Sequence, residues 1–208
     1  MVKDPAIAYR YGHFLGSRYR DWSHIIWVLG GDPQPSRDVG VPERLAMIRA
    51  MAEGLADGTG GLDRQDGQAD WTSTLMTYHP RGGGQSSSKH LHGEPWLDFN
   101  MIETWTEWFK VYQAVLSDAQ LIPIKPVVLG EGAYEDGPEY PLGPITPLVC
   151  RRQAWWAFCA GGYFTFGQNQ NWRYEPEWAN SLDTPGAEQM GVFRQVATSR
   201  PWWQRVPD

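Results

Sequence analysis

The sequence has few cysteines, fewer basic than acidic side chains, and no long apolar run. Two cysteines among 208 residues are too few for a disulfide scaffold, so we expect Cys150 and Cys159 to be buried free thiols on one helix. The 18 basic against 24 acidic side chains, with a net charge of -6, exclude a strongly basic nucleic-acid-binding protein. No apolar run approaches the ~20 residues of a membrane span, and the amino terminus lacks the apolar segment of a signal peptide.

Tryptophan, in contrast, is abundant, with 12 residues. Its large ring suits both core packing and stacking on sugar faces. We expect most of these rings to pack between helices and strands. Trp172 and Trp178 differ because they lie in a polar loop, and we expect them to stack on a saccharide.

The apolar pattern alternates between helices and strands. It predicts helices over residues 6–20, 42–56, 105–116, 147–160 and 185–198, and strands over residues 24–29, 73–78, 96–101, 125–129 and 162–166. Residues 57–70 and 81–92 read as loops. This order is typical of an α/β fold with a parallel sheet, although 208 residues are short for a full (β/α)8 barrel of roughly 250 residues.

Polar side chains follow the predicted strands at their carboxyl ends. These are Asp32, His79, Asn100, Glu131 and Gln168, one for each strand in chain order. Because the ligand site of a parallel α/β fold lies beyond the carboxyl ends of its strands, we expect these side chains to lie at one site.

Asp32 and Glu131 are carboxylates that each follow an apolar strand and a glycine. Two opposed carboxyl groups perform glycoside hydrolysis, in which one protonates the leaving oxygen and the other attacks the anomeric carbon or activates water. The alternatives are that each caps a helix or pairs with an arginine, and Glu135 competes with Glu131 for the second role. His79 could hydrogen-bond a sugar hydroxyl or orient a carboxylate.

Other motifs give no clear indication of a metal, a phosphate-binding loop or a nucleophilic serine. His90 and His92 form an i, i+2 pair, but no third ligand follows at metal-like spacing, so we expect no metal. The glycines at 82–84 lack the Lys-Ser/Thr of a phosphate loop, and no Gly-x-Ser-x-Gly motif marks a nucleophilic serine. We expect no cofactor.

The order of these motifs resembles the apiosidase-like glycoside hydrolases. The resemblance runs from about Tyr9 to Pro207, and the segments that carry it are residues 27–32, 77–80 with the following Gly and Ser runs, 96–102, 125–131, 134–135, 151–154, 182–190 and 199–201. It implies a (β/α)8 barrel, here incomplete and covering about strands four to eight, with the whole chain as one partial catalytic domain.

The resemblance also implies the roles of individual residues. Asp32 becomes the acid/base and Glu131 the nucleophile. From their positions in the sequence, we further expect His79, Asn100, Tyr134, Gln168 and Trp172 to contact the substrate. The implied reaction is release of apiose from pectic rhamnogalacturonan side chains, in a secreted or periplasmic setting. Retention and inversion of configuration both stay open.

Two other functions remain open. One is a different exo-glycosidase specificity, such as an arabinofuranosidase, and the other is a saccharide-binding protein without turnover. We expect an oligosaccharide or polysaccharide as the partner, with no nucleic acid and no membrane. An open barrel edge is an aggregation liability unless it is covered, so pairing of two copies is a further expectation.

Overall fold

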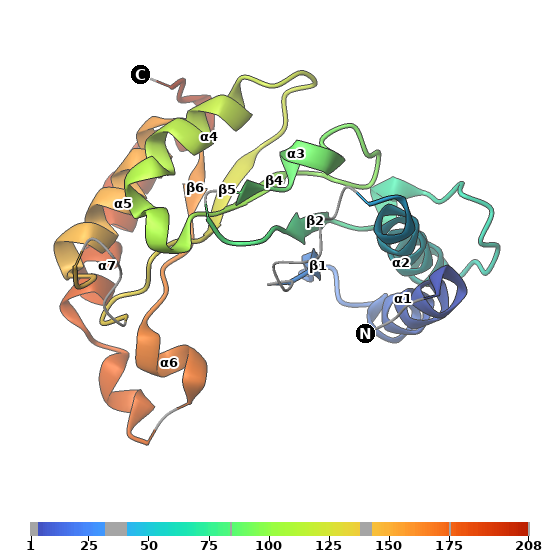
Figure 1. Ribbon diagram of the computed structural model, residues 1–208, viewed down its shortest axis with the longest axis horizontal. Coiled ribbons are helices and arrows are strands. Elements are labelled where there is room, and N and C mark those ends of the chain that lie inside the picture. Colours follow the sequence, from blue (N-terminus) through green and yellow to red (C-terminus); the bar gives the residue numbers. More distant parts are fainter. Residues whose placement is uncertain (1–3, 32–40, 84, 138–142, 175, 208) are drawn as a thin grey trace. The chain divides into compact units, whose positions relative to one another are not determined.

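The computed structural model describes residues 4–31, 41–83, 85–137, 143–174 and 176–207 (Figure 1). The chain divides into two compact units. The first unit holds the residues up to Arg81 together with Ser87–Phe99, and the second unit holds Gly82–Ser86 together with the chain from Asn100 onward.

The first unit pairs two helices with a short parallel sheet. Its elements are α1 (Pro5–Tyr19), β1 (Trp27–Gly30), α2 (Pro42–Gly60), the 3-10 turn η1 (Trp71–Ser73), β2 (Met76–His79) and α3 (Ser88–Leu91). Strands β1 and β2 are parallel, with Gly30 opposite His79. The core contains Leu29, Leu55, Met76, Tyr78, Leu91, Trp96 and Leu97.

Helices α1 and α2 pack closely because glycines line both surfaces. A Cβ atom on Gly12 would lie 2.3 Å from the Met51 carbonyl oxygen, and one on Gly54 would lie 2.1 Å from the Tyr9 carbonyl oxygen. The backbones of α1 and α2 are therefore in direct contact along this interface, and no side chain larger than hydrogen fits at these glycines.

Tyr9 adds a buried polar contact to the same helix pair. Its hydroxyl donates to Asp57 Oδ2 at 2.8 Å and accepts from the Arg64 backbone N–H at 3.0 Å. Burial and the hydrogen bond to Asp57 raise the pKa of Tyr9 to about 12. The hydroxyl thus stays neutral and ties α1 to α2 and to the chain after it.

The second unit is a sheet covered by helices. Its elements are β3 (Gln85–Ser86), β4 (Asn100–Glu103), η2 (Trp105–Lys110), α4 (Val111–Ala119), β5 (Val127–Glu131), α5 (Pro147–Cys159), β6 (Tyr163–Phe164), α6 (Asn169–Arg173), η3 (Trp178–Ser181), α7 (Pro185–Thr198) and η4 (Trp202–Gln204). The strand order is β3-β4-β5-β6, in which β3 is antiparallel to β4 and the other pairs are parallel.

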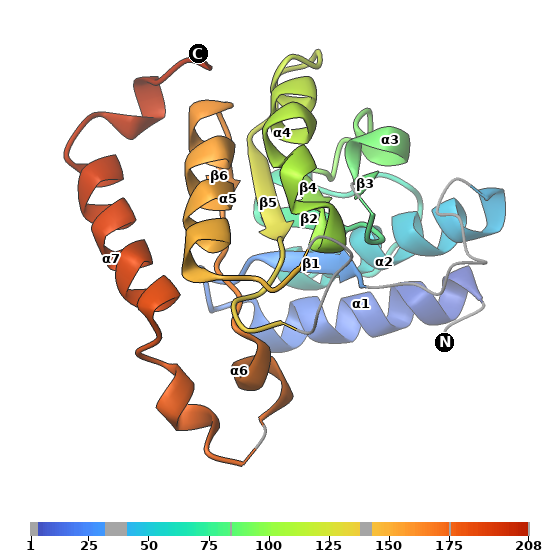
Figure 2. The same ribbon diagram turned by 60° about the vertical axis from the view of Figure 1, so that its left-hand side comes forward.

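Helices α4 and α5 lie side by side against this sheet (Figures 1 and 2). Ile102 of β4 and Leu129 of β5 point toward them and join Val111, Val115 and Ala157 in a fully buried core. Because side chains alternate along a strand, the residues next to Ile102 point to the opposite face.

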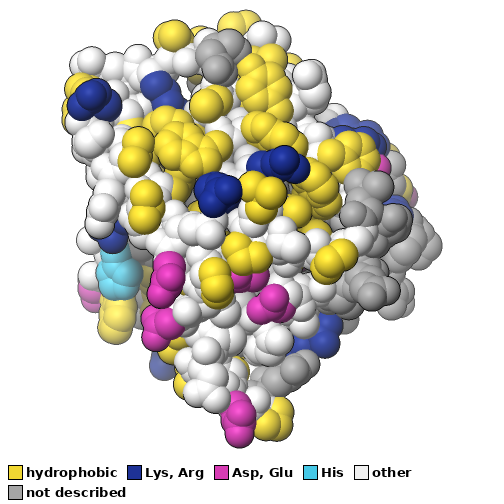
Figure 3. All heavy atoms as spheres, turned by 90° about the vertical axis from the view of Figure 1, so that its left-hand side faces the viewer, with side chains coloured by type: hydrophobic (Ala, Val, Ile, Leu, Met, Phe, Trp, Pro, Cys, Tyr) yellow, Lys and Arg dark blue, Asp and Glu magenta, His cyan; other side chains and the backbone are white. Residues whose placement is uncertain are grey.

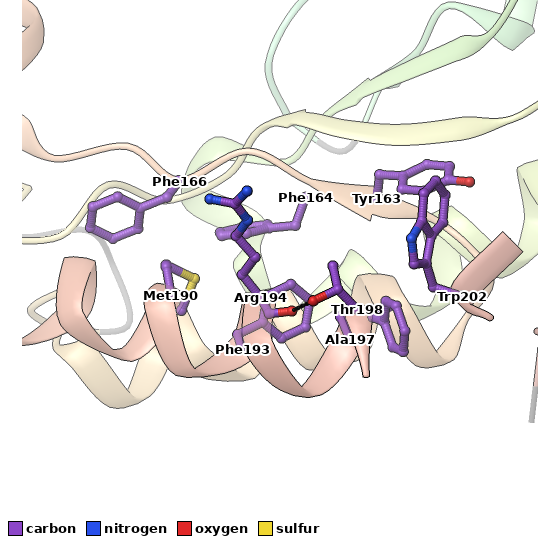
Figure 4. A pocket seen from close by; sticks show the side chains of 10 residues that line it. Tyr163, Phe164, Phe166, Met190, Phe193, Arg194, Ala197, Thr198 and Trp202 are labelled. Atoms are coloured by element: carbon purple, nitrogen blue, oxygen red, sulfur yellow. Dashed lines mark hydrogen bonds between the residues drawn. The ribbon is translucent and has the colours of Figure 1, made fainter. Parts of the chain in front are cut away.

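Helix α7 packs on α5 and leaves an apolar hollow beside β6. The hollow has a volume of about 340 Å³. Figure 4 shows Phe164 and Phe166 facing Met190 and Phe193 of α7 across it. In the upper part of the face shown in Figure 3, a few Lys or Arg side chains lie among hydrophobic ones, and Asp or Glu side chains lie below them.

The structure confirms the predicted helices near residues 6–20, 147–160 and 185–198. It corrects the loop at 57–70, because α2 continues to Gly60 and ends where Gly61 adopts a left-handed φ of 72°. It also corrects the loop at 81–92, which contains β3 and α3. No helix in the described ranges is long and apolar enough to span a membrane.

Candidate active site

The carboxyl ends of β4 and β5 bring two glutamates together. Ile102 pairs with Leu129, but the next residue, Glu103, pairs with Glu131, so Gly130 is an extra residue in β5. This bulge turns Glu131 to the same face of the sheet as Glu103, because without it Glu131 would point toward the helices. A carboxylate oxygen of Glu103 lies within 4.8 Å of one of Glu131.

Glycine at position 130 is required by this bulge. A Cβ atom there would lie 2.0 Å from Met101 Cε and 2.7 Å from Met101 Cγ. The backbone N–H of Thr104 then donates to the Glu131 carbonyl oxygen at 2.9 Å, which continues the pairing beyond the bulge. Gly130 is therefore part of the bulge that sets the direction of the Glu131 side chain.

Tyr134 holds the Glu131 carboxylate. Its hydroxyl donates to Glu131 Oε1 at 2.8 Å. The Tyr134 ring lies against Gly167, where a Cβ atom would approach the ring to 2.3 Å. A hydrogen bond to the charged form stabilises a carboxylate as its anion, so Tyr134 favours ionised Glu131.

Glu135, the competitor for the second carboxylate role, is buried and used within the fold. Its Oε1 accepts from the Gly186 backbone N–H at 2.7 Å, and its Oε2 accepts from the Thr184 hydroxyl. Gly186 lies in the first turn of α7, so Glu135 satisfies the amino terminus of that helix. This contact favours the capping role for Glu135.

His79 lies at the end of β2 in the first unit, as expected. Its Nδ1 is 2.8 Å from the Pro80 carbonyl oxygen. Because a carbonyl only accepts, Nδ1 carries a proton. Asp32, the predicted acid/base, lies outside the described residues.

Asn100 does not lie where the sequence placed it. It is the first residue of β4, pairs with Val127 and is fully buried. The predicted strand at 96–101 begins four residues too early, so Asn100 lies at the amino end of β4 and Glu103 at its carboxyl end. The expectation that Asn100 joins the other polar residues at the carboxyl ends is wrong.

Gln168 is buried and caps the short helix α6. Its Oε1 accepts from the backbone N–H groups of Gln170 and Asn171 at 2.7 and 3.1 Å. Its amide nitrogen donates to Asp136 Oδ2 at 3.3 Å. Both ends of this side chain are therefore engaged in holding the loop after β6, and its predicted contact with substrate stays a prediction.

Trp172 and Trp178 are accessible aromatic rings. Trp172 is 57% exposed, and the Arg173 guanidinium lies over its ring at 4.9 Å from the centroid. Trp178 is 38% exposed and contacts the edge of Tyr174. The other tryptophans include packed pairs such as Trp108 and Trp156, whose rings stack at 5.9 Å.

Sequence reasoning missed Glu103. It lies two residues beyond the predicted strand at 96–101, and no periodicity marks a bulge in the neighbouring strand. Its burial, at 2% exposed, and its pairing with Glu131 are properties of the sheet register.

Parallel strands with carboxylates at their carboxyl ends are found in glycoside hydrolases. The chain belongs to the apiosidase-like family, because the model of the family's catalytic domain matches residues 2–204. The resemblance read from the motifs is therefore confirmed.

Two solved structures are similar to this chain. One is described as a glycoside hydrolase, with 28% identity and a TM-score of 0.78 over 99% of this chain and 49% of that one. The other is a glycoside hydrolase family 5 protein from Bacteroides vulgatus ATCC 8482, with 28% identity and a TM-score of 0.77 over 99% of this chain and 47% of that one. The chain thus spans about half the length of these structures. No curated protein matches it.

Proposed function

We propose that this glycoside hydrolase releases a terminal, apiose-like sugar from pectic rhamnogalacturonan side chains with two carboxylates. Glu131 is the nucleophile and Asp32 the acid/base. The observation that carries the proposal is the carboxylate of Glu131, which ends a parallel strand and accepts a hydrogen bond from Tyr134. The match to the apiosidase-like family supports the substrate class.

In the proposed reaction, Glu131 attacks the anomeric carbon while the bond to the leaving oxygen breaks. Asp32 donates its proton to that oxygen, so the alcohol departs neutral. Water then attacks the glycosyl-Glu131 ester, with Asp32 taking its proton, and frees Glu131. Two displacements at one carbon retain its configuration.

We also infer that the five strands β1, β2, β4, β5 and β6 correspond to strands four to eight of a (β/α)8 barrel. The parallel pairs β1-β2 and β4-β5-β6 and the helices between them support this assignment. So does the similarity to glycoside hydrolases of about twice this length. In a barrel, Glu131 would lie on the catalytic face, where the carboxyl ends of the strands meet.

The test is turnover of apiose-bearing pectic oligosaccharides by wild type and by Glu131→Ala, Glu131→Gln and Asp32→Asn. We expect each variant to lose about 10³-fold or more of kcat/KM with its fold intact by circular dichroism. Azide should rescue Glu131→Ala, because it replaces the missing nucleophile and forms a glycosyl azide of inverted configuration.

Turnover by Glu131→Gln at the wild-type rate would overturn the assignment of the nucleophile. Preferred hydrolysis of an aryl arabinofuranoside would favour the arabinofuranosidase alternative. Saturable binding of the oligosaccharide without any product would favour the saccharide-binding alternative.

A further inference from the structure

Helix α5 carries one glutamine that is fully buried. Gln153 is 0% exposed, and the other buried residues of the helix are apolar, among them Cys150, Ala154 and Ala157. Burial of a primary amide is costly unless its oxygen and its nitrogen both form hydrogen bonds. A hydrophobic residue would pack here without that cost, so the amide at this position points to a specific contact.

Both ends of the Gln153 amide bind the backbone of one residue, Ala133. The Ala133 N–H donates to Gln153 Oε1 at 2.8 Å, and Gln153 Nε2 donates to the Ala133 carbonyl oxygen at 3.0 Å. Facing residues of two antiparallel strands exchange two hydrogen bonds in the same way. Because β5 ends at Glu131, the Gln153 side chain takes the place of a strand neighbour for the chain beyond that end.

The backbone is held on both sides of Tyr134. Before it, Ala133 is bound by Gln153. After it, the Glu135 N–H donates to the Gly167 carbonyl oxygen at 2.9 Å. Since these contacts fix the backbone at the neighbouring residues, they also set the direction in which the Tyr134 side chain leaves it.

We propose that Gln153 is a positioning residue, which places the Tyr134 hydroxyl on the Glu131 carboxylate by fixing Ala133. The hydroxyl donates to Glu131 Oε1 at 2.8 Å, and a shift of about 0.5 Å is enough to weaken such a hydrogen bond. The inference rests on the proposed role of Glu131 as nucleophile. It extends the site to a residue of α5 that acts on Glu131 through the chain.

Gly132 makes room for the contact between Gln153 and Ala133. A Cβ atom on Gly132 would lie 2.5 Å from Gln153 Oε1. A side chain at this position would therefore push the amide oxygen away from the Ala133 N–H. The glycines on the two sides of Glu131 thus have separate roles, because Gly130 forms the bulge and Gly132 admits the glutamine.

The test is the ¹³C spectrum of the chain labelled at tyrosine Cζ, because this carbon responds to hydrogen bonding by the phenol hydroxyl. The Tyr134 resonance is the one missing in Tyr134→Phe, and its position in Glu131→Ala marks the hydroxyl without that carboxylate. Gln153→Met keeps the length of the side chain and removes both hydrogen bonds, so it should move the resonance most of the way to that position. Val115→Ala truncates a fully buried core residue of α4 and is the control, which should leave the resonance in place.

Gln153→Glu separates hydrogen bonding from packing. A protonated carboxyl group donates from its hydroxyl and accepts at its carbonyl oxygen, as the amide does. At about pH 5, where burial keeps such a carboxyl group protonated, the Tyr134 resonance of Gln153→Glu should coincide with that of wild type at the same pH. If Gln153→Met does not fold, this comparison decides the inference, and a displaced resonance would contradict it.

Turnover gives a second readout. Tyr134→Phe and Gln153→Met should each lower kcat/KM by about 10–100-fold, the loss expected for one hydrogen bond to a charged group. The double variant should lose no more than Tyr134→Phe alone, because Gln153 acts through Tyr134. Val115→Ala should keep the kcat/KM of wild type.

Three outcomes would overturn the inference. They are an unmoved Tyr134 resonance in folded Gln153→Met, an equal movement in Val115→Ala, and a double variant whose loss is the product of the two single losses. If wild type does not turn over substrate, the proposed function fails, and the resonance still shows whether Gln153 holds Tyr134 on Glu131.

Discussion

At the scale of the residue, three glutamates of the second unit have different surroundings. Glu131 is partly exposed at the end of β5, Glu103 is buried beside it, and Glu135 is buried against α7. In the sequence, residue type and position relative to a strand leave both Glu131 and Glu135 as candidates for the second catalytic carboxylate. The hydrogen bonds of Glu135 to Thr184 and Gly186 separate them, and these contacts span 49 and 51 residues of sequence.

Replacement of Glu135 should therefore weaken the fold. Glu135→Ala leaves the Gly186 N–H and the Thr184 hydroxyl without their acceptor and should lower the free energy of unfolding by about 2 kcal/mol. Urea denaturation measures this change. Glu188→Ala, also in the first turn of α7, should cost less than about 1 kcal/mol, and equal losses in both variants would contradict the capping role.

The two cysteines should differ in reactivity. Burial, together with the charges of Glu135 and Asp136, raises the pKa of the Cys150 thiol to about 12, so the reactive thiolate is scarce at pH 8. Cys159 is only partly buried. In the folded chain, a disulfide reagent at pH 8 should modify Cys159 first, and Cys159→Ser should abolish the fast phase. A fast phase that survives in Cys159→Ser would contradict the prediction.

Tyr9 makes the first unit sensitive to alkali. Its pKa is raised to about 12 in the folded chain against about 10 when unfolded, so the stabilisation is complete below pH 10 and is lost as the pH rises toward 12. Tyr9→Phe should therefore flatten the fall in thermal stability between pH 10 and 12. Identical pH dependence in wild type and Tyr9→Phe would contradict this linkage.

At the scale of the element, local signals fixed the helices better than the strands. Prolines at the first helical position of α1, α2, α5 and α7 mark their starts in the sequence. The strands lie further along the chain than the apolar runs predict; for example, β1 begins at Trp27 and β4 at Asn100. An apolar run reports burial, whereas a strand is defined by hydrogen bonds to a partner that the sequence does not reveal. The misplaced Asn100 and the missed Glu103 share this cause.

The α1–α2 contact gives a prediction at the same scale. Gly54→Ala should lower the free energy of unfolding by about 1–3 kcal/mol, because its Cβ atom would meet the Tyr9 carbonyl oxygen at 2.1 Å and force the helices apart. Gly191→Ala in α7 is the matched control, since no atom lies within 4 Å of its Cβ position. It should stabilise the chain by about 0.5–1 kcal/mol. A similar loss of stability in both variants would contradict the packing explanation for Gly54.

At the scale of the whole molecule, each unit has its own core and its own edge strand. Within the described residues, β1 pairs only with β2, and β6 pairs only with β5. A hollow of about 650 Å³ lies beside β1, lined by Trp27, Val28 and Leu15 among others, and the smaller hollow in Figure 4 lies beside β6. Alternation of helices and strands in the sequence predicts parallel pairs, but it does not predict which strands remain at an edge.

An edge strand with an exposed apolar side chain favours association between chains. Val28 of β1 is 50% exposed, so Val28→Lys should place a charge on this edge and reduce self-association of the chain. Val192→Lys in α7 alters a residue that is 60% exposed and lies away from any strand, and it should leave association unchanged. Light scattering coupled to gel filtration over a range of concentrations measures both variants. Equal association of Val28→Lys and wild type would exclude β1 as the contact, whereas monomeric Val28→Lys would identify the edge of the first unit as the surface that two copies share.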